Sequence, residues 1–344
     1  MMQQLMMVVL VFIGTICFAQ NTTNAGEYMN YFSSEYQIIQ KDMWDYTKSV
    51  SHGRSAKKVE KRRMELIRTC ENALKKAEGA KDFNGSSEYK DAVVEYFTII
   101  NLVLKEDYAK IVDMEAVAEQ SYDAMEAYMM ARDLASDKQM EASEALSLKQ
   151  KEFAEANNIQ LISSEDKMDQ KMKIAGEVFD HYNEVYLIFF KSNKQELYLL
   201  DAIGRGDMSG IEQNREALKA TVEEGFIKLK DVKLYEGDAA MVDATKDLFK
   251  FYESEASKSV DLAIDYFLKM ENFEKIKEAF DQKKERDRTQ EDIDQYNNSV
   301  NDLNSAVEAY NAANEDNNRM RGKLIDAWNN TAGKFTNKYV PRGN

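Results

Sequence analysis

Proline, histidine and cysteine are scarce in this chain of 344 residues, and each scarcity excludes a class of structure. The single proline, Pro341, lies close to the C-terminus, so no proline interrupts helices elsewhere by removing a backbone donor. The two histidines, His52 and His181, leave a closed zinc site short of nitrogen and sulfur ligands. With only two cysteines, Cys17 and Cys70, the fold must depend on a packed core.

The N-terminal segment reads as a secretory signal peptide. Its apolar run, residues 5–18, is too short to span a bilayer and fits the core of such a peptide. Cleavage is expected after Ala19, which removes residues 1–19. A lipid anchor at Cys17 is disfavoured, because the residue before it is a bulky isoleucine. The mature chain then keeps Cys70 alone, and we expect it to be extracytoplasmic and without a transmembrane span.

Acidic residues outnumber basic ones, and the net charge is −15. This balance argues against general nucleic-acid binding, which needs clustered Lys and Arg. One basic cluster stands out: Arg54, Lys57, Lys58, Lys61, Arg62 and Arg63. A solvated helix face is the favoured interpretation. The alternative is a patch for anionic lipid or polysaccharide headgroups, and with it peripheral membrane association.

Strong helix formers fill long stretches of the chain, while strand-like alternation is rare, so the sequence predicts an all-α fold. Residues 26–157 also recur, with drift, at 176–314. The spacing between matching residues never decreases along the chain, and it increases where loops are expected. This pattern indicates that the two segments align with one another, with insertions in the loops of the second. Matching pairs include Gly26 and Gly176, Tyr36 and Tyr186, Gly53 and Gly204, Arg63 and Arg215, Gly85 and Gly237, Phe97 and Phe249, and Ala156 and Ala313.

We interpret the repeat as two tandem halves, each like an antiparallel four-helix bundle, because short glycine turns favour antiparallel neighbours. The first half is residues 20–157, a linker follows at 158–165, and the second half with a C-terminal helical extension is 166–341. Trp328 is expected to anchor the extension against the second bundle. The expected helices run near 26–50, 56–82, 87–120 and 121–157, then near 166–202, 209–234, 238–284 and 287–338.

Turn residues recur between the second and third helix of each half. Gly85 and Gly237 are expected to end the second helix, since glycine tolerates the left-handed backbone conformation. The residue after each glycine, Ser86 or Asp238, is expected to cap the next helix by accepting its free amide protons.

An arginine interrupts the apolar stripe of the second helix in both halves. Arg63 and Arg215 need carboxylate partners there, because burying a lone cation is costly. A structural salt bridge is favoured, and a bound ligand anion is the alternative. Residues 185–190 are apolar on every side, which favours burial of Phe189 and Phe190; the alternative is an exposed patch for a partner.

No constellation of catalytic residues emerges. His181 and Glu184 share a helical face, but a metal site would need more ligands. Cys70 lies on an apolar stripe and aligns with Val222, which favours an inert core thiol. No phosphate loop, nucleophile elbow or calcium loop is present. We therefore expect no enzymatic activity, no metal and no cofactor.

Two segments carry a resemblance to a known family: Lys151-Glu152-Phe153-Ala154-Glu155-Ala156-Asn157-Asn158 before Ile159-Gln160-Leu161, and the closing Trp328, Phe335 and Val340-Pro341. With the signal peptide and the doubled bundle, the chain resembles an uncharacterised family of surface or secreted all-helical proteins of spirochaetes and Bacteroidota. The resemblance implies an envelope location and this architecture, and it brings no catalytic residues.

Three function classes stay open at this point. The leading hypothesis is a non-enzymatic extracytoplasmic scaffold or binding protein, whose partner is an unknown envelope protein or surface component. The second is a carrier or sensor of a small or amphipathic ligand held between the two bundles. The third is an enzyme of unrecognised type.

Overall fold

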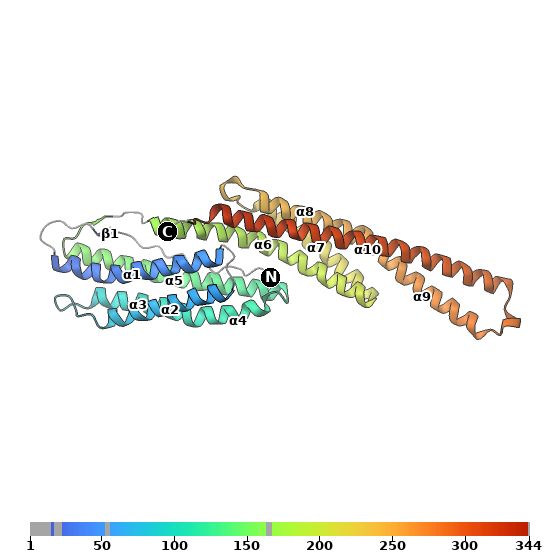
Figure 1. Ribbon diagram of the computed structural model, residues 1–344, viewed down its shortest axis with the longest axis horizontal. Helices are drawn as coiled ribbons and strands as arrows, with labels where there is room; N and C mark the ends of the chain where they lie inside the picture. Colours follow the sequence, from blue (N-terminus) through green and yellow to red (C-terminus); the bar gives the residue numbers. More distant parts are fainter. Residues whose placement is uncertain (1–14, 17–22, 52–55, 163–166, 343–344) are drawn as a thin grey trace. The chain divides into compact units, whose positions relative to one another are not determined.

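The computed structural model describes residues 15–16, 23–51, 56–162 and 167–342, and helices dominate these ranges (Figure 1). The all-α fold expected from the sequence is confirmed. Two short strands, β1 (Thr15–Ile16) and β2 (Leu161–Ile162), pair antiparallel. The helices are α1 (Thr23–Ser51), α2 (Ala56–Glu78), α3 (Glu88–Leu102), α4 (Tyr108–Ala118), α5 (Tyr122–Ala156), α6 (Lys167–Arg205), α7 (Met208–Asp231), α8 (Ala240–Ser254), α9 (Val260–Gln282) and α10 (Gln290–Tyr339).

Most of the expected signal peptide lies outside the described residues, Cys17 and Ala19 included. Among the described helices, none is long and apolar enough to cross a membrane.

The chain packs into two compact units, which we call unit 1 (Met1–Asn183 with Lys334–Asn344) and unit 2 (Glu184–Gly333). The boundaries fall inside α6 and inside α10. This division by packing differs from the linker expected at 158–165, and the boundary between the sequence repeats stays a prediction.

Unit 1 is built from helices that pack along their lengths. α1 lies against α2, α2 against α3, and α5 against both α3 and α4 (Figure 1). The expected stripe of α2 is buried at Leu66, Cys70, Ala73 and Ala77. Large aromatic side chains fill the same interior, because each removes a wide apolar area from water: Trp44, Tyr96, Phe97, Tyr108 and Tyr128.

Unit 2 centres on aromatic packing between α6 and α10. Phe189 and Phe190 are only 6% and 5% exposed, as the all-round apolar segment predicted. The Phe189 ring stacks on Trp328 with centroids 4.6 Å apart. The indole nitrogen of Trp328 donates to the Thr245 hydroxyl of α8 at 2.8 Å, so the anchoring role expected of Trp328 is confirmed within this unit.

The turns before α3 and α8 share a left-handed backbone but differ in their caps. Gly85 and Gly237 have φ of +83° and +73°, but the expectation that they end the preceding helices is wrong, because α2 already ends at Glu78 and α7 at Asp231. Asp238 accepts a hydrogen bond from the Ala240 amide at 3.0 Å, as expected of a cap. The cap expected at Ser86 is wrong: its backbone closes the turn against Phe83, and α3 begins after Ser87 instead.

A π turn interrupts each of the helices expected at 87–120 and 238–284, which the sequence did not predict. These turns are η1 (Val103–Asp107), between α3 and α4, and η3 (Glu255–Ser259), between α8 and α9. In each turn an amide donates to the carbonyl five residues earlier, so the turn takes in one residue more than an α-helix would. The flanking helices still continue on either side.

Two glycines of unit 2 offer a matched test of its packing. A Cβ at Gly225 of α7 would lie 2.7 Å from Phe249 Cζ, whereas a Cβ at Gly322 of α10 meets nothing within 4 Å. Gly225→Ala should therefore lower the free energy of unfolding by about 1–3 kcal/mol through overpacking. Gly322→Ala should raise it by about 0.5–1 kcal/mol, because alanine favours the helix.

Urea unfolding followed by Trp328 fluorescence in a Trp44→Phe background reports on unit 2, since Trp44 belongs to unit 1. Equal effects of the two alanine substitutions would contradict the close packing of α7 on α8.

Candidate functional site

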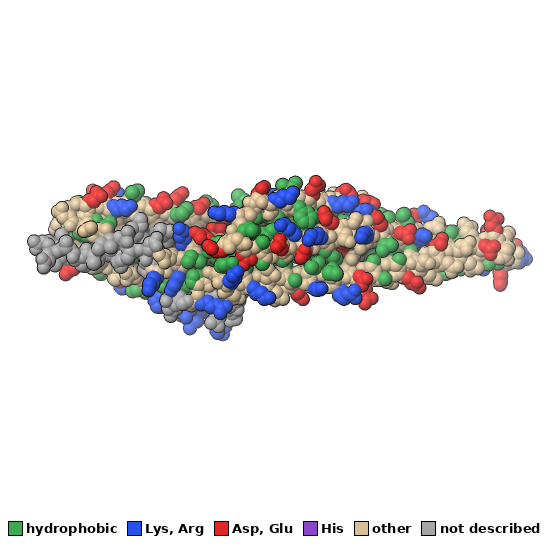
Figure 2. Space-filling model, turned by 90° about the horizontal axis from the view of Figure 1, so that it is seen from above, with side chains coloured by type: hydrophobic (Ala, Val, Ile, Leu, Met, Phe, Trp, Pro, Cys, Tyr) green, Lys and Arg blue, Asp and Glu red, His purple; other side chains and the backbone are tan. Residues whose placement is uncertain are grey.

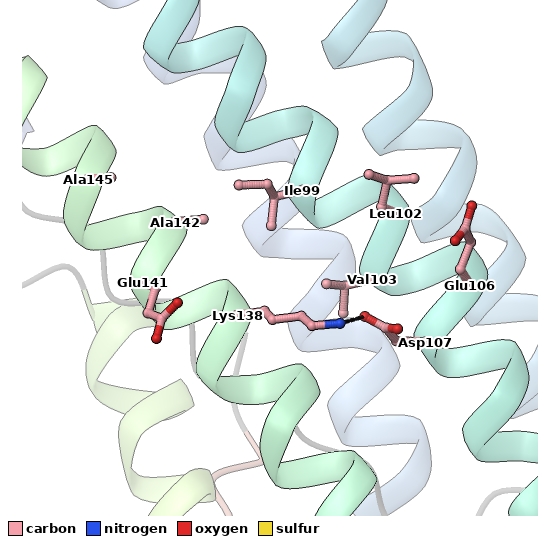
Figure 3. A pocket seen from close by; sticks show the side chains of 9 residues that line it. All are labelled: Ile99, Leu102, Val103, Glu106, Asp107, Lys138, Glu141, Ala142 and Ala145. Atoms are coloured by element: carbon pink, nitrogen blue, oxygen red, sulfur yellow. Dashed lines mark hydrogen bonds and ion pairs between the residues drawn. The ribbon is translucent and has the colours of Figure 1, made fainter.

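A groove of about 460 Å³ lies between α5 and the helix that α3 and η1 form together (Figure 3). Ile99, Val103 and Ala142 give it an apolar floor, and Leu102 and Ala145 lie at its rim. Val103 is 1% exposed, while its neighbour Leu102 is 48% exposed. We call this feature the α3–α5 groove.

The π turn contributes directly to the groove. Val103, Glu106 and Asp107 all belong to η1 and all line it. A widened turn presents side chains at angles that a regular helix does not reach, which is one reason why such turns recur at functional sites.

Charged side chains surround the apolar floor. Lys138 of α5 reaches across to Asp107, with Nζ 2.8 Å from Oδ2 (Figure 3). Glu106 and Glu141 are exposed, and neither forms an ion pair within the described part of the chain. The rim therefore carries more negative than positive charge.

The apolar surface extends along α5 beyond the groove itself. Leu134 and Leu148 are 58% and 61% exposed. Leu134 lies four residues before Lys138, and Leu148 three residues after Ala145, so the helical spacing places them on the same face as the groove lining. From Leu134 to Leu148 this face runs for about 20 Å at 1.5 Å per residue.

The two arginines singled out by the sequence have carboxylate partners. Arg63 donates to both oxygens of Glu60 at 2.9 Å and to the Leu104 carbonyl of η1 at 3.4 Å. Arg215 pairs with Asp261 of α9 at 2.8 Å. These contacts agree with structural salt bridges, and neither arginine lines the α3–α5 groove.

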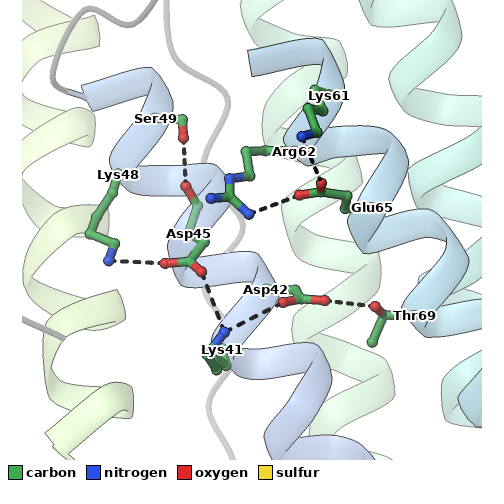
Figure 4. A network of polar contacts seen from close by, with 9 residues as sticks. All are labelled: Lys41, Asp42, Asp45, Lys48, Ser49, Lys61, Arg62, Glu65 and Thr69. Carbon is green, nitrogen blue, oxygen red and sulfur yellow. Dashed lines mark hydrogen bonds and ion pairs between the residues drawn. The ribbon is translucent and has the colours of Figure 1, made fainter. Parts of the chain in front are cut away.

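The basic cluster of α2 is partly neutralised by carboxylates (Figure 4). Arg62 and Lys61 both pair with Glu65, at 2.8 and 3.7 Å. Burial works to raise the pKa of Asp45 on α1, but Lys48, Lys41 and Arg62 together outweigh it and hold that pKa below its ordinary value.

Lys57 and Lys58 are exposed, and Arg54 lies outside the described residues. Figure 2 shows Lys and Arg side chains gathered at the lower edge of the molecule, beside the grey atoms, and acidic and basic side chains intermingled over the rest of that face. The patch for anionic headgroups stays a prediction.

The remaining candidates lie in the interior. Phe189 and Phe190 are buried, and so is His181, whose ring centroid lies 5.1 Å from that of Phe335. Burial raises the pKa of the Cys70 thiol, which suits an unreactive core residue. In the part of the chain that the structure describes, no group of His, Cys, Asp and Glu side chains is arranged to hold a metal ion.

The α3–α5 groove is not predicted by the sequence pattern. The sequence signal that could have indicated the groove is a set of large apolar residues that lie off the buried stripes, namely Leu102, Leu134 and Leu148. The π turn left no recognisable trace in the composition of η1.

Comparison with known proteins adds no relative. No protein-family model matches the chain, and neither a curated protein nor a solved structure is significantly similar to it. The resemblance to surface proteins of spirochaetes and Bacteroidota therefore stays a prediction, and function has to be argued from the geometry.

Proposed function

We propose that the protein is a non-enzymatic helical binding protein of the bacterial envelope, and that its α3–α5 groove receives a basic amphipathic helix of a partner protein. The observation that carries this proposal is a groove with an apolar floor and an acidic rim, whose apolar surface is continued along α5 by exposed leucines.

Apolar exposure supports a docking role. Leu102, Leu134 and Leu148 leave about half or more of their surface in water. Burying such surface contributes roughly 25 cal/mol per Å², so a partner that covers these side chains gains affinity directly. Exposed apolar surface rimmed by polar groups is typical of interaction sites.

The shape of the groove favours a helical partner. It is bounded by two helices, and a third helix can pack into such a space through side chains spaced three and four residues apart. A face of about 20 Å matches a partner helix of roughly four turns.

Charge favours a basic partner. Glu106, Asp107 and Glu141 surround the floor against one cation, Lys138. The chain as a whole is also acidic, with a net charge of −15. Complementary charge speeds association and excludes acidic competitors more than it raises affinity.

We also propose that the two halves arose as an internal duplication. In support, η1 and η3 begin at Val103 and Glu255, the same separation along the chain as that of Gly85 and Gly237. The residue that corresponds to Leu102 is Ser254, so this exposed leucine at the rim has no apolar counterpart in the second half.

A synthetic peptide can test the groove. The probe is a labelled helix of about four turns with leucines spaced three and four residues apart and lysines on the other face, and the readout is fluorescence anisotropy. It should bind more tightly than a scrambled peptide of the same composition. Ala145→Trp fills the groove from its rim and should weaken binding at least about tenfold, or 1.4 kcal/mol. Glu141→Lys should also weaken it, because it reverses one acidic charge.

Ala109→Trp is the matched control, since Ala109 is an exposed alanine of α4 that does not line the groove. Equal binding of the helical and scrambled peptides, or equal loss in both tryptophan variants, would refute the proposal.

The envelope location has its own test. Expressed in a bacterial host with its own N-terminus, the chain should be exported and begin at Gln20, as read by intact-mass measurement of the periplasmic fraction. Val11→Asp breaks the apolar run and should leave an uncleaved precursor in the cytoplasm. A mass that shows an acylated Cys17, or export unaffected by Val11→Asp, would contradict the expected processing.

A further inference from the structure

Three charged side chains meet inside unit 2, although they come from three separate segments. Glu196 of α6 is 0% exposed, Glu255 of η3 is 3% exposed, and Arg321 of α10 is 12% exposed. Arg321 Nε donates to Glu196 at 2.5 Å, and Arg321 Nη2 donates to Glu255. One cation thus serves two buried carboxyl groups.

The charges of this cluster do not cancel if both carboxyls are ionised. The Oε2 atom of Glu196 and the Oε2 atom of Glu255 are both buried, and among the described residues only the Tyr252 hydroxyl, which faces Glu196, offers a donor to either. The two carboxyls also lie within hydrogen-bonding reach of each other. A proton on one can therefore be donated to the other, which removes the excess charge and occupies these oxygens.

Among the described residues, the neighbouring elements bring no second cation to the pair. On α8, the Tyr252 hydroxyl accepts a hydrogen bond from Asn193 of α6 at 3.1 Å and faces Glu196, where its own hydrogen bonding works to lower the pKa of that carboxyl. On α7, which also packs against η3, the nearby cation Arg215 pairs with Asp261 rather than with Glu255. On α10, Arg321 Nη1 donates to Asn318.

We propose that Glu196 and Glu255 share one proton at neutral pH, and that its loss on alkalinisation loosens the hold of Arg321 on α6 and η3. The stability of unit 2 then depends on a proton. In unit 1, the position of the π turn that corresponds to Glu255 is occupied by the buried residue Val103, which carries no titratable group. The proposal is independent of the α3–α5 groove, which lies in unit 1.

The electrostatics agree with a retained proton. Burial raises the pKa of Glu255 to about 8, the negative charge of Glu196 adds to this effect, and Arg321 opposes it. Burial also raises the pKa of Glu196.

The direction of the pH effect follows from these shifts. The folded cluster binds more protons than the unfolded chain between the ordinary glutamate pKa of 4.5 and about 8. The contribution of this proton to the free energy of unfolding is therefore fully present below that pH window. It decreases as the pH rises through the window and stays low above it. For one proton, the unfolding equilibrium constant rises by at most about tenfold per pH unit.

Urea unfolding of the full chain between pH 5 and pH 9, followed through Trp328 in the Trp44→Phe background, measures how the free energy of unfolding changes with pH. We call this change per pH unit the slope. Glu255→Gln mimics the protonated acid and should flatten the slope between pH 6 and pH 8. Glu253→Gln is the matched control, because Glu253 is an exposed glutamate two residues away, and it should keep the parent slope. Equal slopes in both variants would overturn the proposal.

A second measurement covers the case in which Glu255→Gln does not fold. In the unsubstituted protein labelled with ¹³C at glutamate Cδ, one carboxyl resonance should titrate above pH 7. Titration of every glutamate below about pH 5.5, close to the ordinary range, would overturn the proposal.

Discussion

The π turns at Val103–Asp107 and Glu255–Ser259 are the constraint on which both sites depend, because each fits one extra residue into a helix that packs on both sides of it. In unit 1, the widened turn places an apolar residue and two acids along the α3–α5 groove. In unit 2, it directs Glu255 into the interior toward Arg321. The same backbone device therefore supports a surface feature in one unit and a buried ionic cluster in the other.

An arginine from a neighbouring helix reaches η1 itself or the helix that follows η3. In unit 1, Arg63 donates to the Leu104 carbonyl inside η1, so a cation partly satisfies the backbone that the wide turn exposes. In unit 2, Arg215 reaches Asp261 just beyond η3. The buried ionic cluster is weak evidence for stability, since desolvation of the charges offsets their attraction. Because the cluster holds two carboxyls and only one guanidinium, its net charge changes when one carboxyl gains or loses a proton.

Much of the helical layout could be predicted from sequence, because strong helix formers, turn glycines and stripes such as Leu66, Cys70 and Ala73 act locally. Burial of Phe189 and Phe190 followed from an all-apolar segment. The cap at Ser86 failed because that residue closes a turn with Phe83, a competition that the side chain alone does not reveal. Glu196, Glu255 and Arg321 were missed because they are far apart in a chain rich in acidic residues, and only the fold brings them together.

The central claim is that each π turn accommodates one extra residue in its helix. The most direct test is a pair of one-residue deletions in unit 2, whose effects are measured by circular dichroism and thermal unfolding. Deleting the exposed Ser257 from η3 lets the turn close as an ordinary α-helix, so α8 and α9 keep their buried faces. Deleting the exposed Asp247 from α8 rotates the preceding part of that helix by about 100° relative to its partners. Unit 2 should unfold cooperatively after the first deletion and lose that cooperativity after the second. Equal damage from both deletions, or greater damage from the loss of Ser257, would contradict the claim.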